Sequence, residues 1–272
     1  MSSAVSPASL TVLVTGASSG IGWETARLLA ERGDAVTVIV HAPDQASGQD
    51  AIARLVASGI DSGRLELATA DFSRLDEVRA MAARIADRHP VLDVLVNNAA
   101  VAAPERRTLT ADGNELSLQV NFLAAYLLTH ELSGPLSARP GSRVVNVTSS
   151  MHRTASIAWN DPHRAKRYSR LAAYAQSQLA LTIFTRESAP WTSVSVHPGV
   201  CDTELLPLYA HEGDSAAEGA AHVARLCDPA TEVESGAYYD RTAPSPAAPV
   251  VLEERTVRRL CKLADQLVAQ HV

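Results

Sequence analysis

The chain has 272 residues, and 46% of them are hydrophobic, which is enough for a sizeable core in one α/β domain. Its 24 basic and 30 acidic residues give a formal net charge of −6, without a lysine or arginine block that would follow a phosphate backbone. Nucleic acid is therefore not an expected partner. The three cysteines, Cys201, Cys227 and Cys261, are too far apart for a CxxC metal pair or a disulfide framework, so we expect reduced thiols, no metal site and a cytoplasmic protein.

The first nine residues are small and polar, without the basic start and apolar core of a signal peptide, and predict a flexible tail. No stretch approaches the roughly 20 uninterrupted apolar residues that a membrane-spanning helix needs. We expect a soluble protein whose single catalytic domain covers residues 10–272.

Short β-branched runs alternate along the chain with longer alanine- and leucine-rich segments, a pattern typical of parallel strands covered by helices. The runs are apolar throughout, as in a parallel sheet that is buried on both faces. The expected strands are 10–14, 35–40, 65–69, 92–96, 143–148 and 194–197, and the expected helices are 20–32, 45–58, 75–88, 113–132 and 168–188. Together they predict a single α/β Rossmann domain, a three-layer, doubly wound parallel sheet.

The regularity weakens after residue 199, where prolines and glycines become frequent. We expect surface helices there, including one over 253–270 with apolar residues at helical spacing. Two long segments, 150–167 and 200–214, are the expected substrate loops. The candidates for lining the substrate space are His152, Trp159, Leu205, Leu206 and Tyr209, and ordinary packing is at least as good an explanation for each of them.

Three glycines, Gly16, Gly20 and Gly22, follow the first expected strand and open the first expected helix. Glycine lets backbone N–H groups and the positive end of a helix approach a pyrophosphate closely. The spacing is GxxxGxG, which differs from the GxGxxG of other Rossmann proteins. The order strand, glycines, helix predicts a dinucleotide site.

The motif at 15–22, Asn97-Asn98-Ala99-Ala100 and Tyr174-Ala175-Gln176-Ser177-Gln178 together resemble the short-chain dehydrogenase/reductase family. Arg167-Tyr168-Ser169-Arg170, Phe184-Thr185-Arg186-Glu187 and Val196-His197-Pro198-Gly199-Val200 resemble its retinol-dehydrogenase-like branch, and the likeness covers nearly the whole chain. The cofactor contacts that the resemblance implies are Gly16, Ser18, Ser19, Gly20, Ile21, Gly22, His41, Asp71, Phe72, Asn98, Ala99, Ala100, Tyr174, Gln178, Pro198, Gly199, Val200 and Thr203.

The end of the second expected strand bears on the choice between NADPH and NADH, because a carboxylate there favours a free 2′-hydroxyl and an arginine favours a 2′-phosphate. This chain has His41-Ala42-Pro43-Asp44, with no basic residue and only a displaced acid. Relatives of the branch usually carry arginine where Pro43 aligns. The resemblance alone makes us prefer NADP(H), and NAD(H) stays open.

Hydride transfer to a carbonyl needs a proton donor at the developing alkoxide and a second donor that orients its oxygen. By resemblance these are Tyr174 and Ser149, with Asn121 as the anchor of a water relay. Gln178 stands where the family has lysine, one helical turn from Tyr174. An opposite charge at about 4–6 Å shifts a pKa by roughly 1–3 units, so a neutral amide could cost roughly 10- to 1000-fold in proton transfer. Gln178 could still bind the ribose hydroxyls.

Three functions stay open. The first is an oxidoreductase that transfers a hydride between nicotinamide and an apolar carbonyl or alcohol, slowed by Gln178 or helped by a cation at Lys166, Arg167 or Arg170. The second is a non-redox cyclase, dehydratase or isomerase, and the third a cofactor-binding sensor without turnover. A glutamine introduced to trap a complex is also compatible with the sequence. We expect a homodimer or homotetramer through the helices at 113–132 and 168–188.

Overall fold

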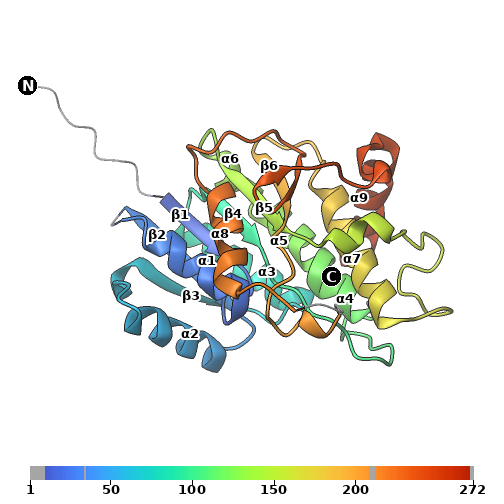
Figure 1. Cartoon of the computed structure of the whole chain (residues 1–272), viewed down its shortest axis with the longest axis horizontal. Helices are drawn as coiled ribbons and strands as arrows, with labels where there is room; N and C mark the ends of the chain where they lie inside the picture. The colour runs from blue at the N-terminus through green and yellow to red at the C-terminus, as the bar shows by residue number, and fades with distance from the viewer. Residues whose placement is uncertain (1–9, 34, 209–211, 270–272) are drawn as a thin grey trace, which may run out of the picture.

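The computed structural model describes residues 10–33, 35–208 and 212–269. Within these ranges an eight-stranded sheet has the order β3-β2-β1-β4-β5-β6-β7-β8 (Figure 1). The pairs from β3 through β7 are parallel, and β8 runs antiparallel to β7. The strands are β1 (Leu10–Val14), β2 (Val36–Ala42), β3 (Leu65–Thr69), β4 (Val94–Asn97), β5 (Arg143–Val147), β6 (Thr192–His197), β7 (Tyr238–Asp240) and β8 (Ala243–Pro244).

Helices cover both faces of this sheet, because successive side chains of each buried strand point to opposite sides. Val12 and Val14 belong to a core with α1, α2 and α8, whereas Leu13 belongs to a core with α3, α5, α7 and α9. The α-helices are α1 (Gly20–Ala30), α2 (Gln45–Ala57), α3 (Leu75–Arg88), α4 (Leu116–Leu118), α5 (Ala124–Glu131), α6 (Ser133–Ser137), α7 (Arg170–Phe184), α8 (Ala216–Leu226) and α9 (Glu254–Ala269). The predicted three-layer, doubly wound single domain is confirmed. Its strand order reverses at β1, between β2 and β4, and ligands of such sheets bind at the carboxyl ends there.

Side-chain caps explain where several helices begin. The Asp44 carboxylate accepts a hydrogen bond from the Ser47 amide at 2.9 Å and starts α2 at the expected residue. Ser169 caps α7, so this helix starts two residues later than predicted. The helix expected from residue 113 begins at Leu116, because Leu109 pairs with Glu115 across a turn and the Glu115 carboxylate caps the helix.

The helix from 116 to 131 is also irregular in its middle. A π turn over Gln119–Leu123 separates α4 from α5. Such a turn opens the backbone ladder by one residue and often marks a functional position. Asn121 lies within it.

Strand boundaries shift by one or two residues from those predicted. β2 continues through His41 and Ala42, β6 already begins at Thr192, and β4 begins only at Val94. The C-terminal part is more regular than expected. α8 is no surface appendage, since Ala220 and Val223 are fully buried, and β7 extends the sheet beside β6.

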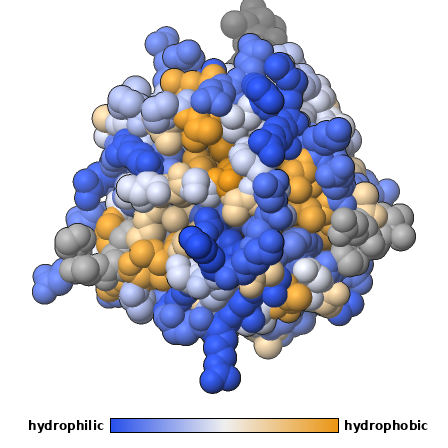
Figure 2. All heavy atoms as spheres, turned by 90° about the vertical axis from the view of Figure 1, so that its right-hand side faces the viewer, coloured by the Kyte–Doolittle hydropathy of each residue, from blue (hydrophilic) through white to orange (hydrophobic). Residues whose placement is uncertain are grey.

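α9 lies against α7 and reaches the helix formed by α4 and α5, at the right of Figure 1. The Tyr126 hydroxyl of α5 donates to the Asp265 carboxylate of α9 at 2.7 Å. Figure 2 turns this side toward the viewer and shows polar residues over most of it, with apolar residues between them. Within the single chain, α9 therefore covers part of the helix pair that we expected to mediate assembly. Among the described residues, no helix combines the length and the apolar character needed to cross a bilayer.

Candidate active site

The loop between β1 and α1 requires glycine for two reasons. Gly16 and Gly20 adopt φ of +64° and +55°, a region that side chains rarely occupy. A β-carbon on Gly22 would lie 2.2 Å from the Gly16 carbonyl oxygen, and one on Gly16 would lie 2.7 Å from the Ala99 Cα atom. Ser19 precedes α1 without a side-chain cap bond. The first N–H groups of this eleven-residue helix therefore face the cleft as an anion site.

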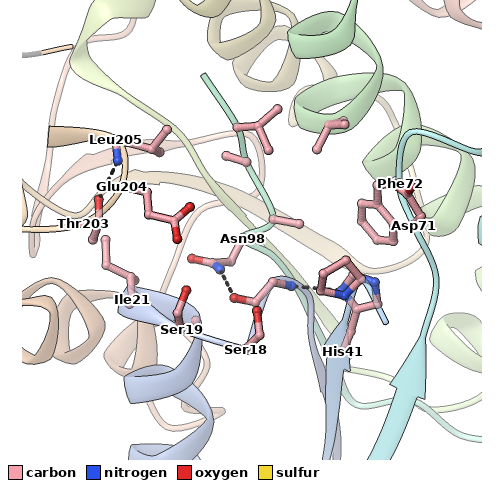
Figure 3. Close-up of a pocket in the computed structure, with 18 of the residues that line it drawn as sticks. Ser18, Ser19, Ile21, His41, Asp71, Phe72, Asn98, Thr203, Glu204 and Leu205 are labelled. Carbon is pink, nitrogen blue, oxygen red and sulfur yellow. Dashed lines mark hydrogen bonds between the residues drawn. The ribbon is translucent and has the colours of Figure 1, made fainter. Parts of the chain in front are cut away.

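Thr15 and Asn98 join this loop to the end of β4. The Thr15 hydroxyl oxygen accepts the amide hydrogens of Asn98 and Ala99 at 2.9 and 3.0 Å. The Asn98 side-chain amide donates to the carbonyl oxygens of Thr15 and Gly16 at 2.9 and 3.2 Å (Figure 3). These hydrogen bonds fix the loop on the side of β4, and its glycines still line a cavity.

His41 braces the same loop from the end of β2. The Gly16 amide lies 3.0 Å from its Nδ1, and its Nε2 lies 3.0 Å from the Ala70 carbonyl oxygen. Only the neutral ring with its proton on Nε2 satisfies both bonds. Burial lowers the pKa of His41 to about 4, and the ring stacks on Phe72 at 4.3 Å. His41 therefore supports the loop, a role that its place in the sequence did not indicate.

A cavity of about 560 Å³ opens above this loop (Figure 3). Of the 18 residues expected to contact the cofactor, 13 line it: Gly16, Ser18, Ser19, Gly20, Ile21, Gly22, His41, Asp71, Phe72, Asn98, Ala99, Ala100 and Thr203. Asp71 also accepts the Ser73 amide at 2.8 Å, so its carboxylate orders a local turn as well.

A smaller cavity of about 60 Å³ adjoins the first and shares Ile21, Asn98, Ala100, Thr203 and Leu205 with it. The second cavity is lined by Tyr174, Gln178, Pro198 and Gly199 and by residues that we had not predicted for the site, among them Thr148, His197 and Cys201. The remaining expected contact, Val200, lines neither cavity.

Gln178 is the least satisfied polar side chain of this smaller cavity. The residue is 1% exposed, and its Nε2 has no hydrogen-bond partner in the described part of the chain. A buried amide without a partner is costly, by about 1–3 kcal/mol. Lys166, Arg167 and Arg170 line neither cavity, and Arg170 pairs with Glu105 at 3.5 Å. Among the residues that the structure describes, no lysine or arginine therefore lines the cavity beside Tyr174.

Burial also keeps the other titratable groups of this cavity neutral. It lowers the pKa of His197 to about 4 and raises the pKa of the Cys201 thiol to about 11. Neither group carries charge near neutral pH. His197 and Cys201 therefore supply no charge of their own to the cavity that holds Tyr174 and Gln178.

Ser149 and Asn121 lie next to this cavity without lining it. Ser149 follows Thr148 at the end of β5, is buried, and its hydroxyl oxygen accepts the Met151 amide at 3.1 Å. Asn121 exchanges two hydrogen bonds with the backbone of Val101, at 2.8 and 3.0 Å. Its amide also donates to the Ser177 hydroxyl at 2.9 Å, and that hydroxyl donates to the Tyr174 carbonyl oxygen at 2.8 Å. Asn121 therefore reaches the tyrosine helix through Ser177.

The expected substrate-lining residues separate into two groups. Leu205 lines both cavities, but His152 is fully buried and bonds to the backbone, so its prediction as a lining residue is wrong. Trp159 packs against the core, with the Arg259 guanidinium 4.2 Å above its ring. Leu206 lies in a short 3-10 turn, and Tyr209 falls outside the described residues.

The cleft fits a nicotinamide dinucleotide. At its glycine end, the helix N–H groups lack a side-chain cap, and the loop has no room for side chains at Gly16 and Gly22. At its other end lies the Gln178 amide, whose Nε2 has no partner among the described residues. The fold places both beside the reversal of strand order. Fold and site together define a Rossmann enzyme that binds a dinucleotide.

The family model for the short chain dehydrogenase matches residues 10–212. Human retinol dehydrogenase 12 is 34% identical over 276 residues, covering 94% of this chain and 85% of its own. Mouse polyprenol dehydrogenase is 40% identical over 213 residues, covering 74% of this chain and 62% of its own. A solved structure of an uncharacterized protein from Mycobacterium paratuberculosis superposes with a TM-score of 0.76 and 31% identity, covering 96% of this chain and 94% of the other.

The chain belongs to the short-chain dehydrogenase/reductase family, in its retinol-dehydrogenase-like branch. It is an enzyme, an oxidoreductase that uses a nicotinamide cofactor, NAD or NADP. The first of the three functions left open by the sequence is therefore the one that the comparisons support.

Proposed function

We propose that this enzyme transfers a hydride between NADP(H) and an apolar carbonyl or alcohol, with Tyr174 as the acid or base. The observation that carries the proposal is a pair of adjoining cavities that share five lining residues, with the glycine loop in the larger one and Tyr174 beside Gln178 in the smaller one. The cofactor supplies or accepts the hydride when bound. Tyr174 exchanges the proton with the substrate oxygen, and Ser149 orients that oxygen.

Gln178 takes one of the two tasks of the usual lysine in this proposal. Its unpaired Nε2 can donate to the ribose hydroxyls of the nicotinamide half. The buried amide would then have the hydrogen-bond partner that it lacks. Its neutral amide does not supply the positive charge by which a lysine would lower the pKa of the tyrosine. Binding is preserved and proton transfer is slowed by roughly 10- to 1000-fold relative to a lysine enzyme.

The test of this proposal is a pair of substitutions at the same cavity. We expect Gln178→Lys to raise kcat by roughly 10- to 1000-fold and Tyr174→Phe to lower it by roughly 100-fold or more, with carbonyl substrate and reduced cofactor followed by nicotinamide absorbance. Gln178→Asn is the matched control, since it shortens the amide without adding charge. Equal activity in the wild type, Gln178→Lys and Tyr174→Phe would refute the assignment, and product formed without cofactor oxidation would favour non-redox chemistry.

We further propose NADP(H) over NAD(H), because of Arg54. Its guanidinium donates to the carbonyl oxygen of Ser18, which lines the large cavity, and lies 5.0 Å from the centre of the Trp23 ring. Pro43 lines the same cavity where arginine would be expected, and Asp44 is engaged as the cap of α2. A cation from α2 would thus replace the missing one at the end of β2.

Arg54 can reach a phosphate at low cost. Its present carboxylate partner is Asp50, at 2.9 Å, and the two side chains are 45% and 68% exposed. Such surface pairs contribute about 0–1 kcal/mol, whereas a charge-assisted bond to a phosphate contributes more. The guanidinium therefore gains by turning from Asp50 to a 2′-phosphate.

Calorimetry with fragments of the cofactor isolates this contact. We expect Arg54→Ala to weaken adenosine 2′,5′-bisphosphate about 10-fold and to leave 5′-AMP unchanged. Arg258→Ala removes an arginine from an equivalent i,i+4 pair on α9 and should change neither. Equal weakening of both nucleotides by Arg54→Ala would show that the arginine only holds the loop.

An apolar substrate is supported by the lining of the cleft. Val101, Leu116 and Leu205 add apolar surface to the large cavity beside the expected cofactor contacts. The names of the relatives specify retinol and polyprenol, which are apolar alcohols. A panel of aldehydes of increasing chain length should show kcat/KM rising with length, and a preference for short polar carbonyls would overturn this part.

Cytoplasmic location and assembly stay predictions. The three cysteines are free thiols, in keeping with a reducing compartment. Because α9 covers part of the α5 and α7 pair, we propose that any homodimer or homotetramer uses another surface. Sedimentation of the wild type and of a Tyr126→Phe variant, which loses the bond to Asp265, tests this: a shift toward dimer in the variant would mean that α9 competes with assembly.

A further inference from the structure

His152 lies three residues after Ser149, in the 3-10 turn Ser150–Thr154, and is fully buried. Its Nδ1 is 2.8 Å from the Ser149 carbonyl oxygen, and its Nε2 is 3.3 Å from the Ala248 amide nitrogen. A carbonyl oxygen only accepts and an amide only donates. The ring is therefore neutral, with its proton on Nδ1, and it connects Ser149 to Ala248, which lies 96 positions after His152.

The segment that carries Ala248 is fixed to the same turn by further contacts. The His152 ring lies 4.6 Å from the Tyr238 ring, and the Arg153 guanidinium lies 5.0 Å from the Tyr238 ring centre. Arg153 also pairs with Asp240 at 3.5 Å. These contacts join the turn to β7, and the Arg153 guanidinium also donates to the Pro246 carbonyl oxygen at 3.2 Å in the segment after β7. The turn after β5, β7 and the segment that carries Ala248 thus pack together around His152.

Ser149 depends on this unit for its backbone position. Its carbonyl oxygen accepts two bonds from the same residue, from the His152 amide at 3.1 Å and from Nδ1. Its hydroxyl oxygen accepts the Met151 amide from the same turn. A shift of the Ser149 carbonyl would therefore carry the hydroxyl with it.

We propose that His152 is a positioning residue for Ser149, which fixes the serine hydroxyl for the substrate oxygen through the hydrogen bond from Nδ1 to the Ser149 carbonyl oxygen. The inference rests on the role proposed for Ser149 above. A misplacement of about 1 Å in a reacting group can cost on the order of 100-fold in rate, so a bond to the backbone of Ser149 has a measurable effect on kcat.

Two amide substitutions separate the bonds of His152. An asparagine amide reaches about as far as Nδ1 and retains a donor for Ser149, whereas a glutamine amide reaches about as far as Nε2 and retains an acceptor for Ala248. We expect His152→Asn to keep kcat within about 3-fold of the wild type, and His152→Gln and His152→Ala to lower it about 10- to 100-fold. The Kd for NADPH should stay constant, because His152 lines neither cavity.

Melting temperatures recorded on the same proteins distinguish positioning from folding. A structural role alone predicts that kcat follows the melting temperature in all three variants, and that result would overturn the proposal, as would equal kcat in His152→Asn and His152→Gln. Loss of kcat in His152→Gln at a melting temperature equal to that of His152→Asn supports it. A wild type without turnover refutes the proposed function and this inference together, whereas turnover that survives Ser149→Ala refutes this inference and leaves the reductase intact.

Discussion

The two ends of the cleft are built differently. At the glycine end, Thr15, Asn98 and His41 satisfy the backbone of the loop through hydrogen bonds of 2.9–3.2 Å. At the tyrosine end, the buried Gln178 amide lacks a partner within the described chain. We therefore expect cofactor binding and proton transfer to be separable in this protein, because our proposal makes the first depend on a preformed loop and the second on one charge that glutamine does not supply.

The largest effect that would break this comparison comes from Gly22→Ala. The added carbon would lie 2.2 Å from the Gly16 carbonyl oxygen and 2.4 Å from the Asn98 amide nitrogen, so the loop must move. We expect NADPH affinity to fall by roughly 100-fold, with about 1–3 kcal/mol less stability.

A glycine elsewhere provides the control for this change. Gly134 lies in α6 with no atom within 4 Å of an added β-carbon. Gly134→Ala should leave affinity unchanged and stability equal or slightly higher. If Gly22→Ala bound NADPH as tightly as Gly134→Ala, the preformed loop would not be what holds the cofactor.

A second effect of similar size concerns acid. The pKa of His41 falls from 6.5 to about 4 on folding because the ring is buried, so the unfolded chain binds its proton more tightly. The stability is fully present above about pH 6.5 and is lost as the pH falls toward 4, by up to about 3 kcal/mol. Urea unfolding across this range should show a shallower pH slope for His41→Gln, which cannot titrate there.

Some of the slope should remain in His41→Gln, because burial also lowers the pKa of His197 and of His152 at the tyrosine end. Equal slopes in the wild type and His41→Gln would mean that His41 does not contribute. Equal slopes in the wild type and His197→Gln would mean that His197 does not contribute.

The smallest expected effect is on NADPH affinity and comes from Glu204 in the 200–214 loop. The Glu204 side chain points into the large cavity toward Ser19 (Figure 3), where the uncapped end of α1 would receive a pyrophosphate. A carboxylate there repels an anion, and the exposed position weakens the effect. Glu204→Gln should tighten NADPH about 2- to 5-fold at low salt and less at high salt. A weaker complex in calorimetry would show that the carboxylate accepts a bond from the cofactor instead.

The glycine end was largely predictable from sequence, since its residues lie at fixed spacings after apolar runs. Gly16, Gly20 and Gly22 can be recognised from their own spacing, without knowing which residues they contact. The structure explains the pattern, because positive φ angles or close contacts at these positions exclude a side chain. The strands and helices before residue 190 were predictable for a similar reason. Two helix starts shifted where Ser169 or Glu115 caps the first turn, and the ends of β2 and β4 shifted by one or two residues.

The supports of the site were not predictable, because each depends on a distant partner. His41 bonds Gly16 across 25 positions, and Asn121 meets Ser177 across 56. From the sequence, His152 was a candidate for lining the cavity, because nothing in the sequence indicates that the Ala248 amide bonds to its ring. The three residues of β7 are too few for a periodic pattern and become a strand only by pairing with β6.

The π turn at Gln119–Leu123 sets the directions in which the side chains of this helix point toward the two ends of the cleft. Gln119 donates to the Phe72 carbonyl oxygen at 3.2 Å, on the side of the glycine end, whereas Asn121 holds Val101 and Ser177 near the tyrosine end. One helix thus serves both ends from positions two residues apart. Removing a single residue from this turn would restore a regular helix and rotate one end against the other by about 100°. The extra residue in the π turn therefore fixes how the two ends of the site are oriented relative to each other.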